Sequence, residues 1–105
     1  MGIPDYNHDL DIDIPEELRS IIPGYLSRRD AELVEMRKAS QNQDFEVIKR
    51  IAHNLKGNGA GYGFYRISDL GAKLMESCSK QDSQGTANLI EELSDEISRL
   101  KAILL

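Results

Sequence analysis

Apolar residues recur every three or four positions along most of the chain, which is the spacing that places them on one face of an α-helix. Four segments carry such a stripe, and Arg29 interrupts the first of them. No segment alternates between apolar and polar residues over a useful length, so the sequence predicts no strand. The four stripes are Ile22, Leu26, Leu33 and Met36; Phe45, Ile48, Ala52, Leu55 and Gly59; Ile67, Leu70, Gly71, Leu74 and Cys78; and Ile90, Leu93, Ile97, Leu100 and Leu104.

Helix-start signals and polar connectors separate these stripes. Pro15, followed by two glutamates, begins a short helix, and Pro23 suits the first residue of the next. Asp44 can cap the third helix. The segments 40–44 and 80–85 are polar connectors. Short connectors between amphipathic helices predict an all-α fold, an antiparallel up-down four-helix bundle with a short N-terminal helix.

The N-terminal segment differs in character from the rest of the chain. Residues 1–14 are polar and acidic, with the alternating run "DLDID" at 9–13. A calcium loop opened by these aspartates would need Gly and Glu where Ile14 and Ser20 stand. We therefore predict an acidic lead-in over 1–14 and one helical bundle domain over 15–105.

Composition excludes several classes of partner. The net charge of -5 and the pI of about 5.0 argue against a nucleic-acid-binding face. No apolar run approaches the length that crosses a bilayer, so we expect no membrane contact. The single cysteine, Cys78, allows no internal disulfide, and its place on an apolar stripe predicts a core position. With no signal peptide at the N-terminus, we expect a cytoplasmic protein.

His53 stands out because it lies on a predicted helix but away from its apolar stripe. A turn of about 100° per residue places it about 130° from the centre of the stripe, so the side chain should be exposed. Lys49, Arg50 and Lys56 flank it on the same wheel, and Gly57 follows one turn later. A glycine inside a helix costs about 1 kcal/mol relative to alanine. Clearing the approach to an imidazole nitrogen is one reason to keep it.

These features suit a histidine that accepts a phosphoryl group. An exposed imidazole is largely neutral near pH 7, and its free nitrogen is a good nucleophile. Flanking cations stabilise the charge of the phosphoryl group through charge-assisted hydrogen bonds. A lone surface histidine on a helix ordinarily has no special role, however, so these residues alone leave both interpretations open.

The segment "AHNLKG" at 52–57, followed by Gly63 and Leu70, resembles the signature of the histidine-containing phosphotransfer (Hpt) domain. The same module forms the phosphorylated domain of chemotaxis histidine kinases. The family pattern is His-x-x-Lys-Gly on a helix, then a stretch of small residues and a hydrophobic-Gly pair. Gly71 also fits, because a small residue on the following helix lets two helices approach closely. The resemblance extends from about Glu16 to the end of the chain.

The resemblance implies an up-down four-helix bundle and a role for each residue of the motif. His53 would be the phosphoacceptor, Lys56 would steady the phosphoryl charge, and Gly57 would give a partner room to approach. Lys49 and Arg50 are added as candidate stabilising residues from the helical wheel alone.

The resemblance also implies the partners. The domain would take a phosphoryl group from the aspartate of one response-regulator receiver domain, or from a sensor histidine kinase on a separate or the same polypeptide, and pass it to another receiver. The receiver would supply the magnesium, so no cofactor or metal is expected on this chain. No GxxxxGK[ST] loop occurs, and we predict a phosphocarrier rather than an enzyme. The alternative is a helical interaction module whose histidine is never phosphorylated.

Two further features have competing interpretations. The glycine-rich "GNGAGYG" at 57–63 follows a helical pattern rather than a strand, so close helix packing explains it better than a nucleotide loop. Tyr62 and Phe64 either form an apolar docking patch near His53 or close the end of the bundle.

Overall fold

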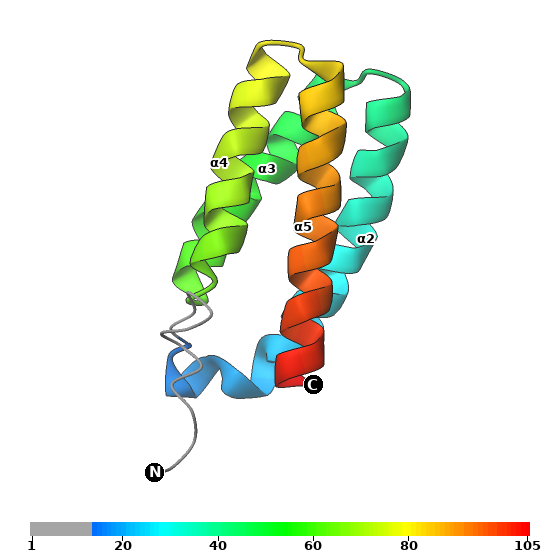
Figure 1. Cartoon of the computed structure of the whole chain (residues 1–105). Helices are drawn as coiled ribbons and strands as arrows, with labels where there is room; N and C mark the ends of the chain where they lie inside the picture. Colours follow the sequence, from blue (N-terminus) through cyan, green and yellow to red (C-terminus); the bar gives the residue numbers. More distant parts are fainter. Residues whose placement is uncertain (1–13) are drawn as a thin grey trace.

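The computed structural model describes residues 14–105, and in that part of the chain every regular element is a helix (Figure 1). The all-α prediction is therefore confirmed. In Figure 1 the chain reverses direction at each turn between successive α-helices, and α3 and α4 form a pair beside the pair of α2 and α5. The elements are a short 3-10 helix, η1 (Glu16–Ile21), and the α-helices α2 (Ile22–Gln41), α3 (Phe45–Gly61), α4 (Tyr65–Ser79) and α5 (Ser83–Leu104).

Capping aspartates, rather than the ends of the polar segments, mark where α3 and α5 begin. The Asp44 carboxylate accepts from the backbone N–H of Val47 at 3.4 Å, as predicted for the N-terminus of α3. Asp82 does the same for α5, accepting from the backbone N–H of Gly85 at 2.9 Å. The connectors predicted over 40–44 and 80–85 are consequently shorter, since each lends residues to a helix.

The glycine-rich segment after His53 does not end the helix where its periodicity fades. Helix α3 continues through Gly57 and Gly59 and ends at Gly61. The turn to α4 then passes through Gly63, whose φ of 85° lies in the left-handed region that glycine adopts without strain. Gly63 therefore allows the turn. The glycines before it lie within α3, where they affect how closely the helix packs and how open its surface is.

The core lies between the four α-helices and contains the predicted stripes. Phe45 and Leu104 are only partly buried, whereas Ile51, which is not part of the predicted stripe, is buried. Ile14, the last residue assigned to the acidic lead-in, is buried in this core with 7% of its surface exposed. The predicted lead-in over residues 1–13 lies outside the described residues. Within the described chain, no helix is long and apolar enough to span a membrane.

Arg29, which interrupts the first stripe in the sequence, is buried within the fold with 5% of its surface exposed. Its guanidinium carbon lies 4.3 Å from the centre of the Tyr25 ring, a cation–π arrangement, and its Nε pairs with the Glu32 carboxylate at 2.6 Å. A buried arginine is tolerated where such partners replace water. The interruption is therefore a buried polar cluster on α2, not an exposed position.

Tyr62 and Phe64 close one end of the bundle, which decides between the two interpretations of these residues. Phe64 is 1% exposed and Tyr62 is partly buried against the core. Both rings pack against Tyr25 of α2, with centroid separations of 4.2 Å for Tyr62 and 5.5 Å for Phe64. These aromatic contacts hold the α3–α4 turn to α2.

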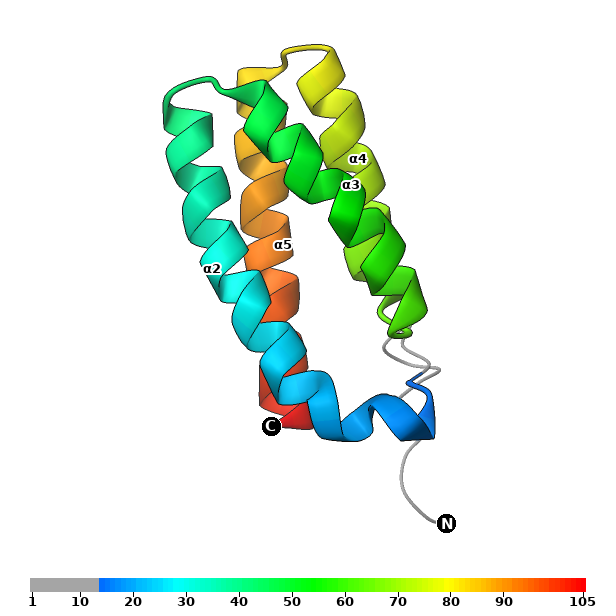
Figure 2. The same ribbon diagram turned by 180° about the vertical axis from the view of Figure 1, so that it is seen from behind.

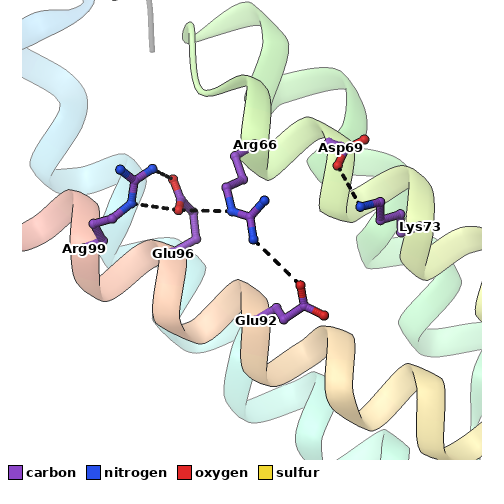
Figure 3. Close-up of polar contacts among 6 residues, drawn as sticks. All are labelled: Arg66, Asp69, Lys73, Glu92, Glu96 and Arg99. Atoms are coloured by element: carbon purple, nitrogen blue, oxygen red, sulfur yellow. Dashed lines mark hydrogen bonds and ion pairs between the residues drawn. The ribbon is translucent and has the colours of Figure 1, made fainter. Parts of the chain in front are cut away.

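A buried carboxylate joins α4 to α5. The Glu96 side chain is 3% exposed and pairs with Arg99 at 2.7 Å and with Arg66 of α4 at 3.5 Å. Figure 3 shows the guanidinium of Arg66 between Glu96 and Glu92, the latter 3.7 Å away, with the Asp69–Lys73 pair farther along α4. Glu96 is thus compensated by two arginines.

Replacing Glu96 by glutamine is expected to lower the free energy of unfolding by about 1.5–3 kcal/mol, because the two arginines lose the negative charge that compensates them and the amide NH2 group cannot accept a hydrogen bond from either. Glu92→Gln is the matched control. Within residues 14–105 its half-exposed side chain pairs with Arg66 alone, so a loss of at most about 1 kcal/mol is expected. Urea denaturation monitored by circular dichroism measures both values. Equal losses would show that Glu96 contributes no more to the free energy of unfolding than the half-exposed Glu92.

Cys78 is buried with 3% of its surface exposed, as its place on the stripe predicts. Burial raises the pKa of its thiol, so little of the reactive thiolate forms. We expect an aromatic disulfide reagent to label native protein at least about 100-fold more slowly than unfolded protein, because labelling requires local opening. Absorbance during labelling in buffer and in denaturant checks this, and equal rates would contradict the buried position.

Candidate functional site

His53 lies midway along α3 with its side chain exposed, as the helical wheel predicts. Figure 2 shows α3 at the front of the molecule with no other helix covering its outer face. Among the described residues, none forms a hydrogen bond or ion pair with the imidazole. Its nitrogens are therefore free to meet a partner molecule.

A shallow, open depression of about 290 Å³ surrounds the imidazole. Its lining combines cationic, acidic, amide and thioether groups, and all but one of its residues belong to α3. The lining residues are Glu46, Lys49, Arg50, His53 and Asn54 of α3, and Met75 of α4. The fold thus brings two of the predicted site residues, Lys49 and Arg50, into one surface feature with His53.

The charge around His53 is more mixed than the wheel suggests. Arg50 forms an ion pair with Glu35 of α2 at 3.4 Å, and both side chains are largely exposed. Glu46 adds a carboxylate to the depression itself. An exposed ion pair of this kind contributes little stability, so the Arg50 guanidinium can exchange Glu35 for another anion at small cost.

Lys56 and Gly57 lie on the turn after His53 and are exposed, but they do not line the depression. Lys56 follows His53 by three residues, and side chains at that spacing lie on one face of a helix. A Cβ added at Gly57 would meet no atom within 4 Å. The outer surface of this turn is therefore open at Gly57.

The inner surface of the same turn is closely packed. A Cβ added at Gly71 of α4 would lie 2.8 Å from the backbone oxygen of Ala52 and 2.8 Å from the backbone nitrogen of Lys56. Only a glycine allows the two helices to come so near. The close approach predicted for Gly71 is thus found at Ala52 and Lys56, the residues directly before His53 and one turn after it.

Sequence reasoning missed three residues of the depression. Glu46 lies seven residues before His53, almost two helical turns away, and the same wheel that identified Lys49 places it on this side. Asn54 is the next residue in the chain. Met75 belongs to another helix, so only the packing of α4 against α3 could identify it. Among residues 14–105, no group of three or more His, Cys, Asp or Glu side chains could hold a metal ion.

Comparison with known proteins gives one result. No curated protein and no solved structure matches the chain. A family model described as Hpt domain matches residues 24–103, which is most of the chain and includes all four α-helices in whole or in part. Hpt domains carry phosphoryl groups on histidine in two-component phosphorelay signalling. The all-helical fold, the exposed histidine on α3 and this match together show that the chain belongs to the Hpt domain family.

Proposed function

We propose that His53 is the phosphoacceptor of a phosphorelay and that this chain carries a phosphoryl group between two signalling partners. The observation that carries the proposal is the exposed imidazole on the open face of α3, without a bonding partner from the described residues, in a chain of the Hpt family. A nucleophile must be reachable and unengaged, and His53 meets both conditions.

The reaction is a transfer from an acyl phosphate to an imidazole. The lone pair of one ring nitrogen of His53 attacks the phosphorus of an aspartyl phosphate. The nitrogen–phosphorus bond forms as the bond to the aspartyl oxygen breaks, and the electron pair leaves with the aspartate carboxylate. The positive charge on the ring is relieved when the other nitrogen gives its proton to water. Reversal of these steps onto another aspartate completes the relay.

Each neighbour of His53 has a role in this proposal. The Lys56 ammonium stabilises the phosphoryl oxygens from the next turn, and Lys49 adds positive charge within the depression. Arg50 exchanges its exposed pairing with Glu35 for the incoming group. Gly57 leaves the outer surface clear for the partner.

The partners follow from the same chemistry. A receiver domain supplies the donor or acceptor aspartate and an acidic pocket with magnesium, which stabilises the transferring group by position and charge. A sensor histidine kinase, on a separate or the same polypeptide, is the upstream source. This chain supplies the imidazole and its cationic surround and acts as a phosphocarrier, with the cytoplasm as its proposed location.

The test is incubation of the chain with a receiver domain phosphorylated at its aspartate, in the presence of magnesium. We expect label to move to this chain and to be acid-labile and alkali-stable, as a phosphoramidate is. A panel of receivers guards against choosing a wrong partner. If no receiver transfers label to the folded chain, the phosphocarrier proposal fails, and the alternative of an interaction module with an unmodified histidine takes its place.

A further inference from the structure

Helix α4 contacts the backbone of Lys56 at two points. The Ser68 hydroxyl donates a hydrogen bond of 2.6 Å to the Lys56 carbonyl oxygen. Gly71, one helical turn further along α4, packs against the Lys56 backbone nitrogen. The Lys56 carbonyl lies inside helix α3, so the Ser68 bond adds to the helical hydrogen bonding and fixes the position of this peptide relative to α4.

The residue after Gly57 is held from the opposite direction. The Asn58 side-chain oxygen accepts a hydrogen bond of 2.7 Å from the Tyr25 hydroxyl and another of 3.3 Å from Arg29. Burial raises the pKa of Tyr25, so its phenol remains protonated and continues to donate. The turn from Lys56 to Asn58 is therefore anchored by α4 through the backbone and by α2 through a side chain.

From this arrangement we propose that Ser68 is a positioning residue for phosphoryl transfer, acting through Lys56. A lysine side chain has four rotatable bonds, so the region its ammonium samples is set partly by how firmly its backbone is held. With the peptide fixed by Ser68, the ammonium samples a smaller region on the His53 side of α3. Small displacements of a positioned group reduce transfer rates substantially. This inference rests on the proposed role of His53 and goes beyond it by assigning a residue of another helix.

The first experiment compares Ser68→Ala with Ser98→Ala, a matched control that removes the hydroxyl of an exposed serine within α5. Transfer from a phosphorylated receiver is measured over a range of receiver concentrations. We expect Ser68→Ala to lower the maximal transfer rate by about three- to tenfold, the effect of one hydrogen bond. The receiver concentration giving half-maximal rate should stay unchanged, because Ser68 belongs to α4 and does not line the depression around His53. Ser98→Ala should match wild type in both quantities.

A double-mutant cycle with Lys56→Ala separates positioning from a general structural role. If Ser68 acts through Lys56, adding Ser68→Ala to Lys56→Ala should lower the rate by less than about twofold. If Ser68 merely supports the helix pair, its loss should slow transfer by the same factor in both backgrounds, and the inference is overturned.

Failure of this inference is distinguishable from failure of the proposed function. Label on wild type, together with equal maximal rates for Ser68→Ala and Ser98→Ala, removes Ser68 from the mechanism and leaves His53 as the phosphoacceptor. Absence of label on the folded wild type removes both. A Ser68→Ala protein with a changed circular dichroism spectrum would show that the hydroxyl maintains the fold and would also overturn the positioning role.

Discussion

Replacing His53 by glutamine is expected to abolish phosphoryl transfer to this chain and to leave its fold intact. Glutamine has similar polarity but no nucleophilic nitrogen, so no nitrogen–phosphorus bond can form. The side chain is exposed and forms no hydrogen bond or ion pair with the described residues. The free energy of unfolding should therefore change by no more than about 0.5 kcal/mol, as for most surface substitutions. Label transfer from a phosphorylated receiver and thermal unfolding by circular dichroism measure the two effects.

The chain offers a matched control in its other histidine, His8. His8→Gln should be labelled as wild type is. Transfer that persists in His53→Gln and disappears in His8→Gln would move the phosphoacceptor to the N-terminal segment. Binding of a receiver by His53→Gln without transfer would separate recognition from chemistry, because the outer face of α3 remains otherwise unchanged.

Gly71→Ala is expected to lower the stability of the protein strongly for the addition of a single methyl group. The new Cβ would lie 2.8 Å from backbone atoms of Ala52 and Lys56 and 3.2 Å from the Leu55 Cβ. Backbone atoms cannot turn aside as a flexible side chain can, so α3 and α4 must separate. Overpacking of this kind costs about 1–3 kcal/mol, and three contacts around one methyl group favour the upper part of that range.

Gly57→Ala is the matched control for this loss. Both glycines lie inside helices, so alanine improves helix propensity by about 1 kcal/mol in each. At Gly57 the added methyl group meets nothing, and the protein should become more stable. The difference between the two variants isolates the packing cost. At about 2 kcal/mol it separates their melting temperatures by about 10 °C.

The order of the two variants in activity should be the reverse of their order in stability: Gly57→Ala should be the more stable and the less active. Gly57→Ala places a methyl group on the open surface of the turn after His53, so the stabilised protein should need a higher receiver concentration for half-maximal transfer. Thermal unfolding and transfer kinetics on the same preparations measure both properties. If the Gly71→Ala protein is as stable as Gly57→Ala, then α3 and α4 have room for a methyl group between them, which would contradict their close approach at Gly71.

The sequence by itself determined the fold class and the position of the histidine. Helical periodicity is a local property that each segment carries, so the four stripes predicted the helices, and the wheel predicted that His53 would be exposed. The caps at Asp44 and the helix start near Pro23 were equally local signals. The predicted helix ends were less accurate. The polar segment 80–85 was predicted to be a connector, but Asp82 caps α5 within it and the helix begins at Ser83.

The surroundings of the histidine depended on the tertiary structure. Arg29 interrupts a stripe in the sequence, yet it is buried because Tyr25, Glu32 and Asn58 surround it. Tyr25 and Glu32 are its neighbours on α2, whereas Asn58 of α3 could be identified only as a partner in space. Tyr62 and Phe64 had two interpretations until their contacts with Tyr25 showed that they close the bundle.

The same distinction applies to the site itself. Residues on α3 could be found from the chain alone, since one helix places them at known angles around His53. Met75 and Ser68 come from α4, and their positions depend on how closely two helices pack, which here is set by the missing side chain of Gly71. A periodic pattern specifies which face of a helix is buried. Which residues of two buried faces meet is decided by packing, because it depends on the shapes of both faces at once.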